Sequence, residues 1–342
     1  MMGEIGVGLI GYGLGGRAFH APYVMATPGM TLRAVLSRDA PKVHATLPAM
    51  TVVPDVDALL RLEGIDLVIV SSPDDLHAEH ALAALRAGKH VVIDKPFATN
   101  LADAQKIAEE ADQQNRLVAA FHNRRWDADF RTLQALVDAG TLGEIVTFES
   151  HFDRWRPHVA PVWKEARAGG SWFDLGPHLV DQALLLFGRP LDIYADIGAL
   201  RHGAQAPDYF HVILRYERMR AILHSSKMTA QHGLRFAVHG TSGSWIKQGV
   251  DPQEAATVAG ASPAGEDWGL DPSDGLLTRP ETGASPVAVQ NSRGDYRLFW
   301  QSLLTAIHGE GPNPVPPESA IAVIEILEAG LHSAREGRAV AL

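Results

Sequence analysis

Hydrophobic and polar positions follow two different patterns along this chain, and the change falls near residue 125. In the first third, short runs of Val, Ile and Leu alternate with longer Ala- and Leu-rich segments of helical periodicity. Strands that are apolar at nearly every position are typical of a parallel sheet, because crossover helices cover both of its faces. The pattern predicts strands at residues 5–10, 32–37, 65–72, 89–94 and 117–123, separated by helices at residues 17–26, 56–62, 78–88 and 102–115.

Beyond residue 125, a helix at residues 129–140 precedes strand-like runs that mostly have no helices between them. Sequential strands joined by short turns form antiparallel sheets, so this part predicts an α+β domain. Residues 249–293, rich in Gly, Pro, Ala, Ser and Asp, predict a long loop. The predicted strands are residues 145–153, 192–200, 209–216, 220–227 and 234–240, and two closing helices are residues 296–309 and 319–337.

The length of 342 residues also favours two domains. We therefore expect an α/β fold in which residues 1–124 form a doubly wound, dinucleotide-binding Rossmann domain. Residues 125–342 are expected to form an α+β domain for substrate binding and oligomerisation, with a large, mostly antiparallel open sheet. The last helix is assigned to this second domain, and packing back on the first domain is the alternative.

Composition and charge exclude several kinds of function. The formal net charge of −10 leaves no excess of Lys and Arg to bind phosphates, so a nucleic-acid partner is not expected. The absence of cysteine removes disulfides and thiolate sites, and the 16 histidines show no His-Glu-x-x-His or similar spacing, so no metal is expected. No run approaches the roughly 18 apolar residues of a membrane span, and nothing resembles a signal peptide, which predicts a cytoplasmic protein.

A glycine-rich turn follows the first predicted strand. Gly11, Gly13 and Gly16 stand in the spacing Gly-x-Gly-x-x-Gly, directly before a helix. Glycines at this spacing permit a tight turn and close backbone approach, while the helix start offers N–H groups to a pyrophosphate. With the alternating strands and helices around them, these residues and Leu14 predict a dinucleotide site rather than a purely structural turn.

The residues after the second strand bear on the choice of cofactor. An NAD site usually has an acid there to bind the ribose 2′-hydroxyl, whereas this chain has Ser37 and Arg38. An Arg beside a hydroxyl suits a 2′-phosphate, so we expect NADP. Asp39 keeps NAD open as the alternative, because a strand two residues longer would place this acid at the ribose. A solvated surface role for Arg38 is the other alternative.

Further candidates lie where the third and fourth predicted strands end. Lys95, between Asp94 and Pro96, follows a parallel strand on the side where doubly wound folds bind ligands. A partly desolvated cation there would stabilise a substrate oxygen as negative charge develops on it. A surface lysine before a turn is an equally open interpretation. After the preceding strand, the candidates for the cofactor side are Ser72, Pro73 and His77, with a helix cap as the alternative for His77.

Four segments together resemble the glucose-fructose oxidoreductase, inositol dehydrogenase and MocA-like oxidoreductase family. They are GLIGYGLGGRAFHAP, HALAALRAGKHVVIDKP, FHNRRWDADF and GGSWFDLGPHLVDQALLLFG, and the resemblance spans nearly the whole chain. Asp94 stands where the family usually has Glu, and Asp74 where Asn often follows the Ser-Pro pair. Within the family, HNRRWD and LGPHLVDQAL are most similar to NADP-dependent scyllo-inositol dehydrogenases.

Asp174 and His178 are the acid-base candidates. A helix that begins near Asp174, with Pro177 in its first turn, and ends at Gly188 would place Asp174, His178 and Asp181 on one face. The helix start disfavours an imidazolium and Asp174 favours it, so the opposed effects predict titration near neutrality. A capping Asp with an incidental His is the alternative from spacing alone. The resemblance implies that the catalytic residues are Lys95, Asp174 and His178.

Other polar and aromatic residues are candidates for binding. Asn123 is assigned to the cofactor, with a salt-bridged hinge as the alternative for its segment. Residues upstream of the Asp-His pair are candidates for a polyol-facing rim, with core or solvated positions as the alternatives. The substrate candidates are Arg124, Trp126, Arg156, Trp163 and Lys164.

Together the residues and the resemblance predict an NADP-dependent dehydrogenase that transfers a hydride between nicotinamide C4 and a secondary hydroxyl or ketone of a cyclitol or sugar. One alternative is a lyase or glycoside-cleaving enzyme that retains NAD(P) and uses transient oxidation. Another is a non-catalytic nucleotide-sensing regulatory protein. Pairing of the second domain's sheet between subunits predicts a homodimer or homotetramer.

Overall fold

The computed structural model describes residues 3–160, 169–231, 233–280, 283 and 285–342. By contacts between residues, the chain divides into two compact units, each built from separate stretches. Unit 1 comprises Met1–Trp126, Pro252–Trp268 and Asp295–Ile324, and unit 2 comprises Asp127–Asp251, Gly269–Gly294 and Glu325–Leu342. A single cut near residue 124 therefore does not describe these units, because two later stretches belong with the first 126 residues.

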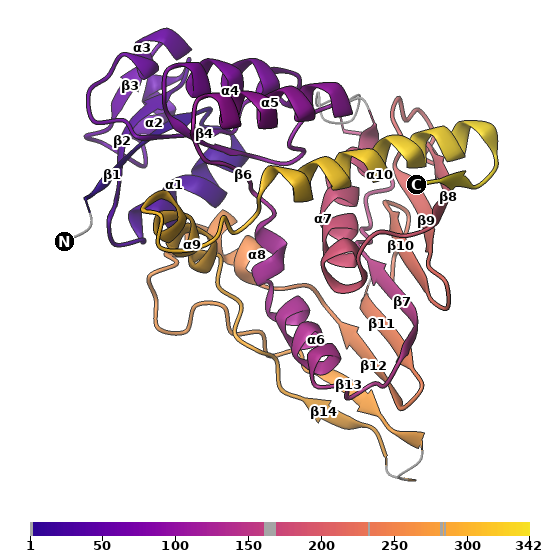
Figure 1. The fold of residues 1–342 in the computed structure, drawn as a ribbon. Helices are drawn as coiled ribbons and strands as arrows, with labels where there is room; N and C mark the ends of the chain where they lie inside the picture. Colours follow the sequence, from indigo (N-terminus) through magenta and orange to yellow (C-terminus); the bar gives the residue numbers. More distant parts are fainter. Residues whose placement is uncertain (1–2, 161–168, 232, 281–282, 284) are drawn as a thin grey trace. The chain divides into compact units, whose positions relative to one another are not determined.

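Unit 1 contains a six-stranded parallel sheet of order β3-β2-β1-β4-β5-β6 (Figure 1). Every residue of β1 and β4 is buried, as the nearly continuous apolar runs predict. The predicted doubly wound fold is confirmed, with one further strand, β3, that is only three residues long. The strands are β1 (Ile5–Ile10), β2 (Met30–Leu36), β3 (Thr51–Val53), β4 (Leu67–Val70), β5 (His90–Ile93) and β6 (Val118–Ala120).

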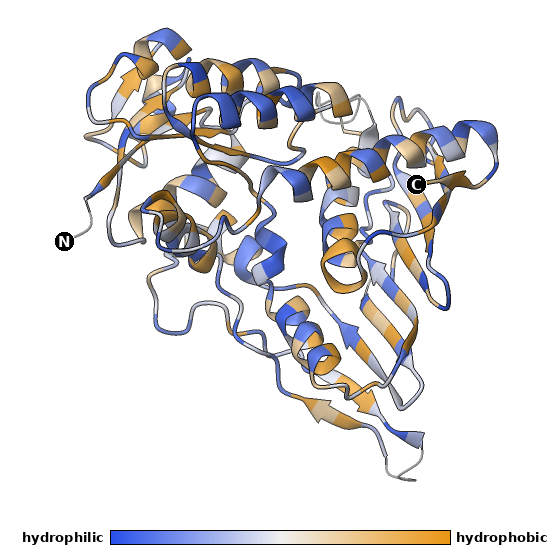
Figure 2. Ribbon diagram, viewed as in Figure 1, coloured by the Kyte–Doolittle hydropathy of each residue, from blue (hydrophilic) through white to orange (hydrophobic). Residues whose placement is uncertain are grey.

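The helices of unit 1 connect these strands and also come from later stretches. In Figure 2, α4 and α5 carry both hydrophilic and hydrophobic colours, as amphipathic helices that cover a sheet should. The helical segments are η1 (Gly15–His20), α1 (Ala21–Met25), α2 (Ala40–His44), α3 (Val56–Leu60), η2 (Asp74–Leu76), α4 (His77–Arg86), α5 (Leu101–Gln113), η3 (Asn123–Trp126), α8 (Gln253–Val258) and α9 (Arg297–Ile307).

The strand order of unit 1 reverses between β1 and β4, which are neighbours in the sheet. In an open α/β sheet, ligands bind beyond the carboxyl ends of the strands at such a switch point. The turn that follows β1 and the segment that follows β4 both begin there. The sheet therefore positions the glycine turn, Ser72 and Lys95 at one edge.

Unit 2 contains a nine-stranded sheet of order β14-β13-β12-β11-β7-β10-β9-β8-β15. Among the described strands, β7 lies between β11 and β10 (Figure 1); it pairs in parallel with β10, and the other pairs are antiparallel. The predicted mostly antiparallel sheet is confirmed. The strands are β7 (Ile145–His151), β8 (Asp192–Gly198), β9 (Tyr209–Arg215), β10 (Arg220–Ser226), β11 (Leu234–Gly240), β12 (Gly243–Gln248), β13 (Gly275–Thr278), β14 (Val287–Val289) and β15 (Val340–Ala341).

The prediction of one long loop at residues 249–293 is wrong in part. This stretch contains α8, β13 and β14, and β13 pairs with β12. These elements are three to six residues long, so they have no sustained periodicity by which a sequence pattern could reveal them.

One face of the nine-stranded sheet is covered by α7 (Gly170–Phe187), which packs on β9 and β10. Side chains alternate along β9, so that Phe210, Val212 and Leu214 are buried while Tyr209 and Ile213 are only half-buried. Helix α6 (Ala128–Asp138) also belongs to unit 2. The residues of α10 (Pro317–Glu336) are divided between the units after Ile324.

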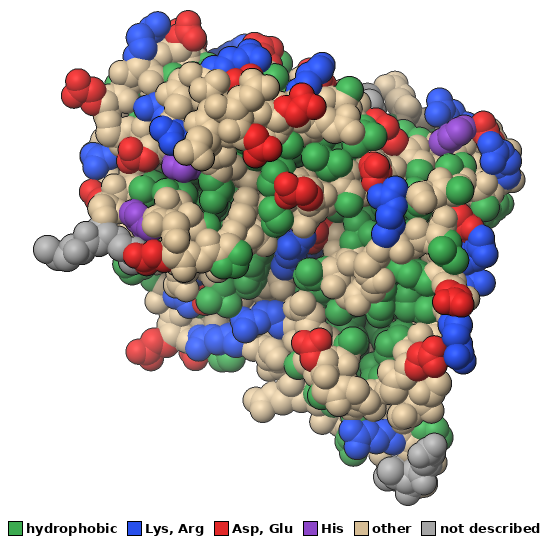
Figure 3. All heavy atoms as spheres, viewed as in Figure 1, with side chains coloured by type: hydrophobic (Ala, Val, Ile, Leu, Met, Phe, Trp, Pro, Cys, Tyr) green, Lys and Arg blue, Asp and Glu red, His purple; other side chains and the backbone are tan. Residues whose placement is uncertain are grey.

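The surface carries charges of both signs. On the face drawn in Figure 3, acidic and basic side chains are interspersed rather than gathered into fields of one sign. The overall balance is acidic, with a formal net charge of −10. Among the described residues, no helix combines the length and the apolar character that crossing a membrane requires.

Candidate functional site

The glycine turn after β1 is tight at two positions and open at a third. Gly11 has φ +95° and donates its N–H to the carbonyl of Leu36 at 3.1 Å. A Cβ added at Gly11 would lie 2.4 Å from the carbonyl oxygen of Ser71, and one added at Gly16 would lie 2.1 Å from that of Gly11. At Gly13 an added Cβ would meet no atom within 4 Å. The turn thus offers exposed backbone with free space in front of it, which fits a dinucleotide pyrophosphate.

The helix that follows this turn differs from the expected one. Residues Gly15–His20 form a π-helical segment, and the short α1 begins only at Ala21. Leu14 precedes the segment as its N-cap residue and is 41% exposed. The first turn still presents backbone N–H groups beyond the end of β1.

The residues after β2 bear on both cofactor interpretations. The strand ends at Leu36 and does not extend two residues further. The carboxylate of Asp39 accepts the backbone N–H of Lys42 at 3.0 Å and thereby caps α2. Arg38 is exposed, and within the described part of the chain no carboxylate lies within ion-pair distance of its guanidinium. Asp39 is therefore committed to the helix, while Arg38 is available to an anion.

His77 joins the ends of β4 and β5. Its Nδ1 lies 2.8 Å from the carbonyl oxygen of Pro96, and its Nε2 lies 3.0 Å from that of Ser72. The ring is 1% exposed. The interpretation as a helix cap is wrong, because α4 begins at His77 and its N-cap residue is Leu76, which makes no side-chain cap hydrogen bond. His77 instead fixes two segments that border the glycine turn, and Pro73 stands before η2 in the first of them.

Asp94 forms a polar cluster that sequence reasoning missed. Its Oδ2 lies 3.3 Å from Nε2 of the fully buried His20 and accepts the hydroxyl of Ser71 at 3.0 Å. Its Oδ1 accepts the backbone N–H of Lys95 at 2.9 Å. Burial alone would raise the pKa of Asp94, but the hydrogen bond and charge of His20, with the charges of Lys95 and His77, hold that pKa well below its usual range.

The close packing around Asp94 also explains why residue 15 is a glycine. A Cβ at that position would lie 2.5 Å from Oγ of Ser71 and 2.6 Å from Oδ2 of Asp94. Glycine alone leaves room for this carboxylate beside the turn. His20 is 74 residues before Asp94 in the chain, so no local signal connects the two.

Lys95 is half-buried and follows β5 at the carboxyl edge of the sheet. Together with Ser72, Pro73, His77, Asp94 and Pro96, it lies on the segments that follow the neighbouring strands β4 and β5. Unit 1 thus brings the predicted cofactor residues from the ends of β1, β2, β4 and β5 to one edge.

The segment Asn123–Trp126 forms the short helix η3. Asn123 and Arg124 are each 6% exposed, and Arg124 makes an ion pair with Glu254 of α8. Trp126 packs edge to face on Phe299, with ring centroids 5.6 Å apart. These contacts favour the salt-bridged alternative for Arg124 and a packing role for Trp126.

Helix α7 starts earlier than the sequence pattern predicts. It begins at Gly170 rather than near Asp174, and it ends before Gly188 as expected. Gly169 and Gly170 have φ of 75° and 50°, and a Cβ at Gly170 would lie 2.1 Å from the carbonyl oxygen of Pro207. The glycines therefore form the helix start itself. Pro177 consequently lies inside the helix.

The earlier start changes the electrostatic argument for His178. This residue is now in the third turn of α7, beyond the first turn in which the helix dipole acts. The face with Asp174, His178 and Asp181 is retained, because the spacings of four and three residues fall within one continuous helix. His178 is 5% exposed, and its ring lies 6.5 Å from that of Phe152.

The predicted rim residues of unit 2 are described only in part. Arg156 is exposed, and its backbone N–H donates to the carbonyl of Lys227 at 2.8 Å. Trp163 and Lys164 lie outside the described residues.

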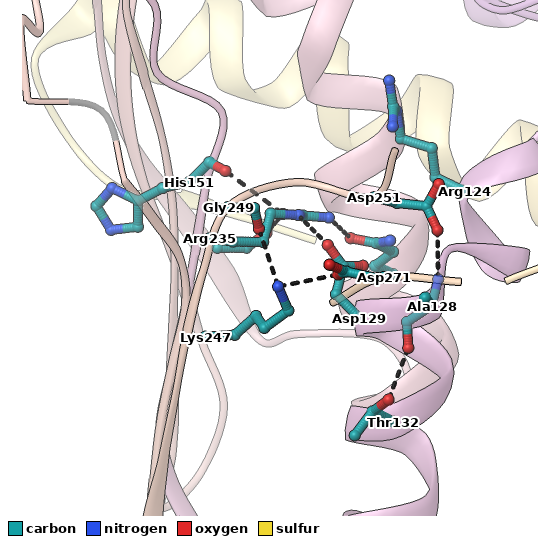
Figure 4. A network of polar contacts seen from close by, with 12 residues as sticks. Arg124, Ala128, Asp129, Thr132, His151, Arg235, Lys247, Gly249, Asp251 and Asp271 are labelled. Atoms are coloured by element: carbon teal, nitrogen blue, oxygen red, sulfur yellow. Dashed lines mark hydrogen bonds and ion pairs between the residues drawn. The ribbon is translucent and has the colours of Figure 1, made fainter. Parts of the chain in front are cut away.

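A buried polar layer connects α7 with α6 and the sheet (Figure 4). The guanidinium of Arg235 is fully buried, lies 3.3 Å from a carboxylate oxygen of the fully buried Asp129, and donates to Gln182 of α7 at 2.8 Å. It also donates to Ser150 of β7 at 2.8 Å. Gln182 stands one turn after His178, so this layer helps to hold the helix that carries the acid-base pair.

Comparisons with known proteins match the chain in two consecutive parts, which are divided between residues 122 and 134 and do not coincide with the two units. A model of an oxidoreductase family's NAD-binding Rossmann fold matches residues 5–122, and a model of the same family's C-terminal alpha/beta domain matches residues 134–342. The chain belongs to the GFO/IDH/MocA oxidoreductase family. As a GFO/IDH/MocA protein it is an NAD(P)-dependent oxidoreductase, in a family whose dehydrogenases act on CH–OH groups.

Three relatives illustrate how similar other GFO/IDH/MocA proteins are. The chain is 46% identical over 339 residues to the uncharacterized oxidoreductase YdgJ of Escherichia coli (strain K12), covering 98% of each chain. It is 35% identical over 343 residues to the scyllo-inositol 2-dehydrogenase (NADP(+)) IolW of Bacillus subtilis (strain 168), covering 99% of this chain and 96% of IolW. The solved structure of YPO2259 from Yersinia pestis has a TM-score of 0.97 and 46% identity, covering 100% of this chain and 98% of that one.

Acidification is expected to destabilise the protein partly through His90 in β5. Its Nδ1 accepts the backbone N–H of Leu117 at 3.0 Å, which requires an unprotonated nitrogen. Burial, and then the charge of Arg116, lower the pKa of His90 below its usual 6.5, against the charge of Asp66. The unfolded chain therefore binds this proton first, so its contribution to stability is present above pH 6.5 and is lost as pH falls through the folded-state pKa.

Thermal unfolding from about pH 8 to about pH 5 checks this expectation. The variant His90→Asn keeps an acceptor that does not titrate, so its Tm should fall less steeply over this range than that of the wild type. His202→Asn, a change of an exposed histidine, should follow the wild-type curve. Equal slopes for wild type and His90→Asn would contradict the argument.

Proposed function

We propose that this protein is an NADP-dependent oxidoreductase that transfers a hydride between nicotinamide C4 and a secondary hydroxyl or ketone of a cyclitol or sugar. The observation that carries the proposal is the face of α7, where Asp174 lies one turn before the buried His178. An acid-base group is needed wherever a hydroxyl loses its proton as a carbonyl forms. The substrate class rests on the similarity to IolW, whose name states scyllo-inositol as its substrate.

The residues have separate roles in this reaction. When bound, the nicotinamide supplies the acceptor for the hydride. His178 takes the proton of the secondary hydroxyl as the C–H bond breaks, and in the reverse direction it returns that proton to the ketone oxygen. Asp174 orients the imidazole and stabilises its positive charge. The ammonium of Lys95 stabilises the negative charge that develops on the substrate oxygen in both directions.

The preference for NADP is supported by the segment after β2. The guanidinium of Arg38, with the hydroxyl of Ser37, suits a 2′-phosphate through charge-assisted hydrogen bonds. The acid that would bind the ribose of NAD, Asp39, already accepts the N–H of Lys42 as the cap of α2. A 2′-phosphate therefore has a positively charged partner at this position.

Replacing Arg38 by Ala should weaken use of NADP selectively. A hydrogen bond to a charged group contributes about 1.5–3 kcal/mol, so kcat/KM with NADP should fall roughly 10- to 150-fold while that with NAD stays unchanged. Arg61→Ala removes an exposed arginine elsewhere in unit 1 and should alter neither value. A loss of equal size with both cofactors would show that Arg38 acts on folding or on the shared part of the cofactor.

A substrate screen tests the function itself. Inositols and aldoses are incubated with the purified protein and NADP or NAD, and their keto forms with the protein and NADPH or NADH, while nicotinamide absorbance is followed. We expect net reduction of NADP with at least one of the cyclitols or sugars. Product formation without any net change in nicotinamide absorbance would contradict the proposal and favour a cofactor-retaining lyase.

The protein is further proposed to form a homodimer or homotetramer through the sheet of unit 2. The face of this sheet opposite to α7 carries half-buried apolar side chains such as Ile213 and Ile222, and Tyr194 on β8 is 45% exposed. Such a face loses unfavourable contact with water when a second copy covers it. Sedimentation at micromolar concentration should give a dimer or tetramer, and Ile213→Lys with Ile222→Lys should shift it to monomer. A monomeric wild type would refute this assignment.

A further inference from the structure

Two histidines and one aspartate converge on the sheet of unit 2, and we call His151, Asp153 and His224 the imidazole cluster. One potential ligand atom from each of the three lies within 4.8 Å of those of the other two. Nδ1 of His151 is 3.4 Å from Oδ2 of Asp153, and Nε2 of His224 is 3.5 Å from Oδ1 of the same carboxylate. Two ligands of a tetrahedral zinc ion, each about 2.1 Å from it, are about 3.4 Å apart. Both distances from an imidazole nitrogen to the carboxylate are therefore close to the spacing of two zinc ligands.

The cluster lies on the face of the sheet opposite to α7. Side chains alternate along an extended chain, and Phe152, between His151 and Asp153, lies on the side of His178. Figure 4 shows the ring of His151 pointing away from the buried layer around Arg235. The cluster is thus separate from the acid-base face and plays no part in the proposed hydride transfer.

Backbone hydrogen bonds hold the cluster in place. His151 and His224 are register partners on the parallel strands β7 and β10. Beyond the end of β7, the N–H of Phe152 donates to the carbonyl of His224 at 2.9 Å, and Oδ1 of Asp153 accepts the N–H of Ser226 at 2.8 Å. The ligands therefore need little reorganisation to receive an ion, which favours binding.

The outer nitrogen of each histidine also has a partner. Nε2 of His151 lies 3.3 Å from a carboxylate oxygen of Glu149, and Nδ1 of His224 lies 3.3 Å from Nδ1 of His211. Histidines that bind metals commonly donate their second N–H to a carboxylate or another acceptor, which leaves the first nitrogen unprotonated toward the ion. Glu149 and His211 stand where such supporting groups are required.

We propose that the imidazole cluster binds one divalent transition-metal ion, Zn²⁺ by its ligand chemistry, through Nδ1 of His151, the carboxylate of Asp153 and Nε2 of His224. With neutral imidazoles, Asp153 and Glu149 supply two negative charges, which match a divalent cation. Nitrogen and carboxylate ligands in this number suit zinc and leave a fourth position for water or another donor. The ion ties β7 to β10, where the sheet has its parallel pair, so it stabilises unit 2.

The test measures zinc binding directly. Full-length protein without a histidine tag is treated with a chelator, dialysed, and titrated with ZnCl₂ in a calorimeter, and in parallel with Co²⁺ for the visible bands of a tetrahedral nitrogen- and oxygen-ligated site. We expect one zinc ion per chain and a zinc-dependent rise in Tm. Glu149→Gln should weaken binding about 10- to 100-fold, as loss of a supporting carboxylate does.

Variants decide whether this cluster is the site. Asp153→Asn changes the ligand with hardly any change in size, and His224→Ala removes one imidazole; each should weaken zinc binding more than Glu149→Gln. His239→Ala removes a histidine of β11 that is hydrogen-bonded to Ser244, and it should bind zinc like the wild type. The proposal is overturned if the wild type binds no zinc, which would leave only an imidazole-carboxylate ion pair, or if well-folded Asp153→Asn binds zinc as tightly as the wild type does.

Discussion

His178→Ala should lower kcat by about 10²- to 10⁴-fold, the range that a positioned general base contributes. The imidazole is 5% exposed and lies one helical turn after Asp174, and alanine has no group that can accept the proton. Cofactor affinity should not change, because the glycine turn, Arg38 and His77 belong to unit 1, whereas His178 belongs to unit 2. The variant therefore separates chemistry from cofactor binding.

Two measurements establish this result. Steady-state turnover at saturating cofactor gives the loss in kcat, and titration of NADPH fluorescence gives the Kd. His239→Ala, in the same unit but on β11, serves as the control and should retain wild-type turnover. Unchanged turnover in His178→Ala would eliminate this residue as the acid-base group.

Arg235→Met should be the most destabilising of the substitutions considered. It leaves the carboxylate of Asp129, which is 0% exposed, without the guanidinium 3.3 Å away. Breaking a buried ion pair by removing one partner costs about 3–5 kcal/mol in the free energy of unfolding. Because the same guanidinium bonds Gln182 of α7, turnover should also fall at temperatures where the variant remains folded.

Another Arg-Asp pair of unit 2, between the strands β8 and β9, provides the control. Arg215 pairs with Asp192, but its side chain is 50% exposed, so Arg215→Met should cost no more than about 1 kcal/mol. The double change Asp129→Leu with Arg235→Met removes both charges and should recover much of the loss. Urea unfolding of the four proteins measures these values. Equal losses for Arg235→Met and Arg215→Met would show that burial does not decide the energetics.

The fold was predictable where strands are long and apolar at nearly every position. β1, β4 and β5 are such strands, and their parallel order follows from the helices between them. β3, β13 and β14, of three or four residues each, were not predicted, and neither was the six-residue β12. The parallel pairing of β7 with β10 was not predictable either, since it joins strands that are not consecutive in the chain.

The candidate site shows the same division. Gly11, Gly13, Lys95, Asp174 and His178 stand in local motifs whose spacing carries a physical reason. The predicted start of α7 was wrong because a pair of glycines, Gly169 and Gly170, is typical of a loop. In the structure, their positive φ angles form the start of the helix. The pairs His20 with Asp94 and Asp129 with Arg235 had no local signal, because only the folded chain brings their side chains together.

The interleaved make-up of unit 1 has a consequence for how the protein is made. The strands of its sheet are synthesised within the first 126 residues, yet Phe299 and Trp300, against which Phe121 packs, leave the ribosome much later. During most of translation, the nascent Rossmann sheet therefore exposes an aromatic surface that its own later segments will cover. Such surfaces are what chaperones bind and what aggregation starts from. A fragment that stops at Trp126 should accordingly be recovered from cells mainly as insoluble protein, whereas the full chain should not.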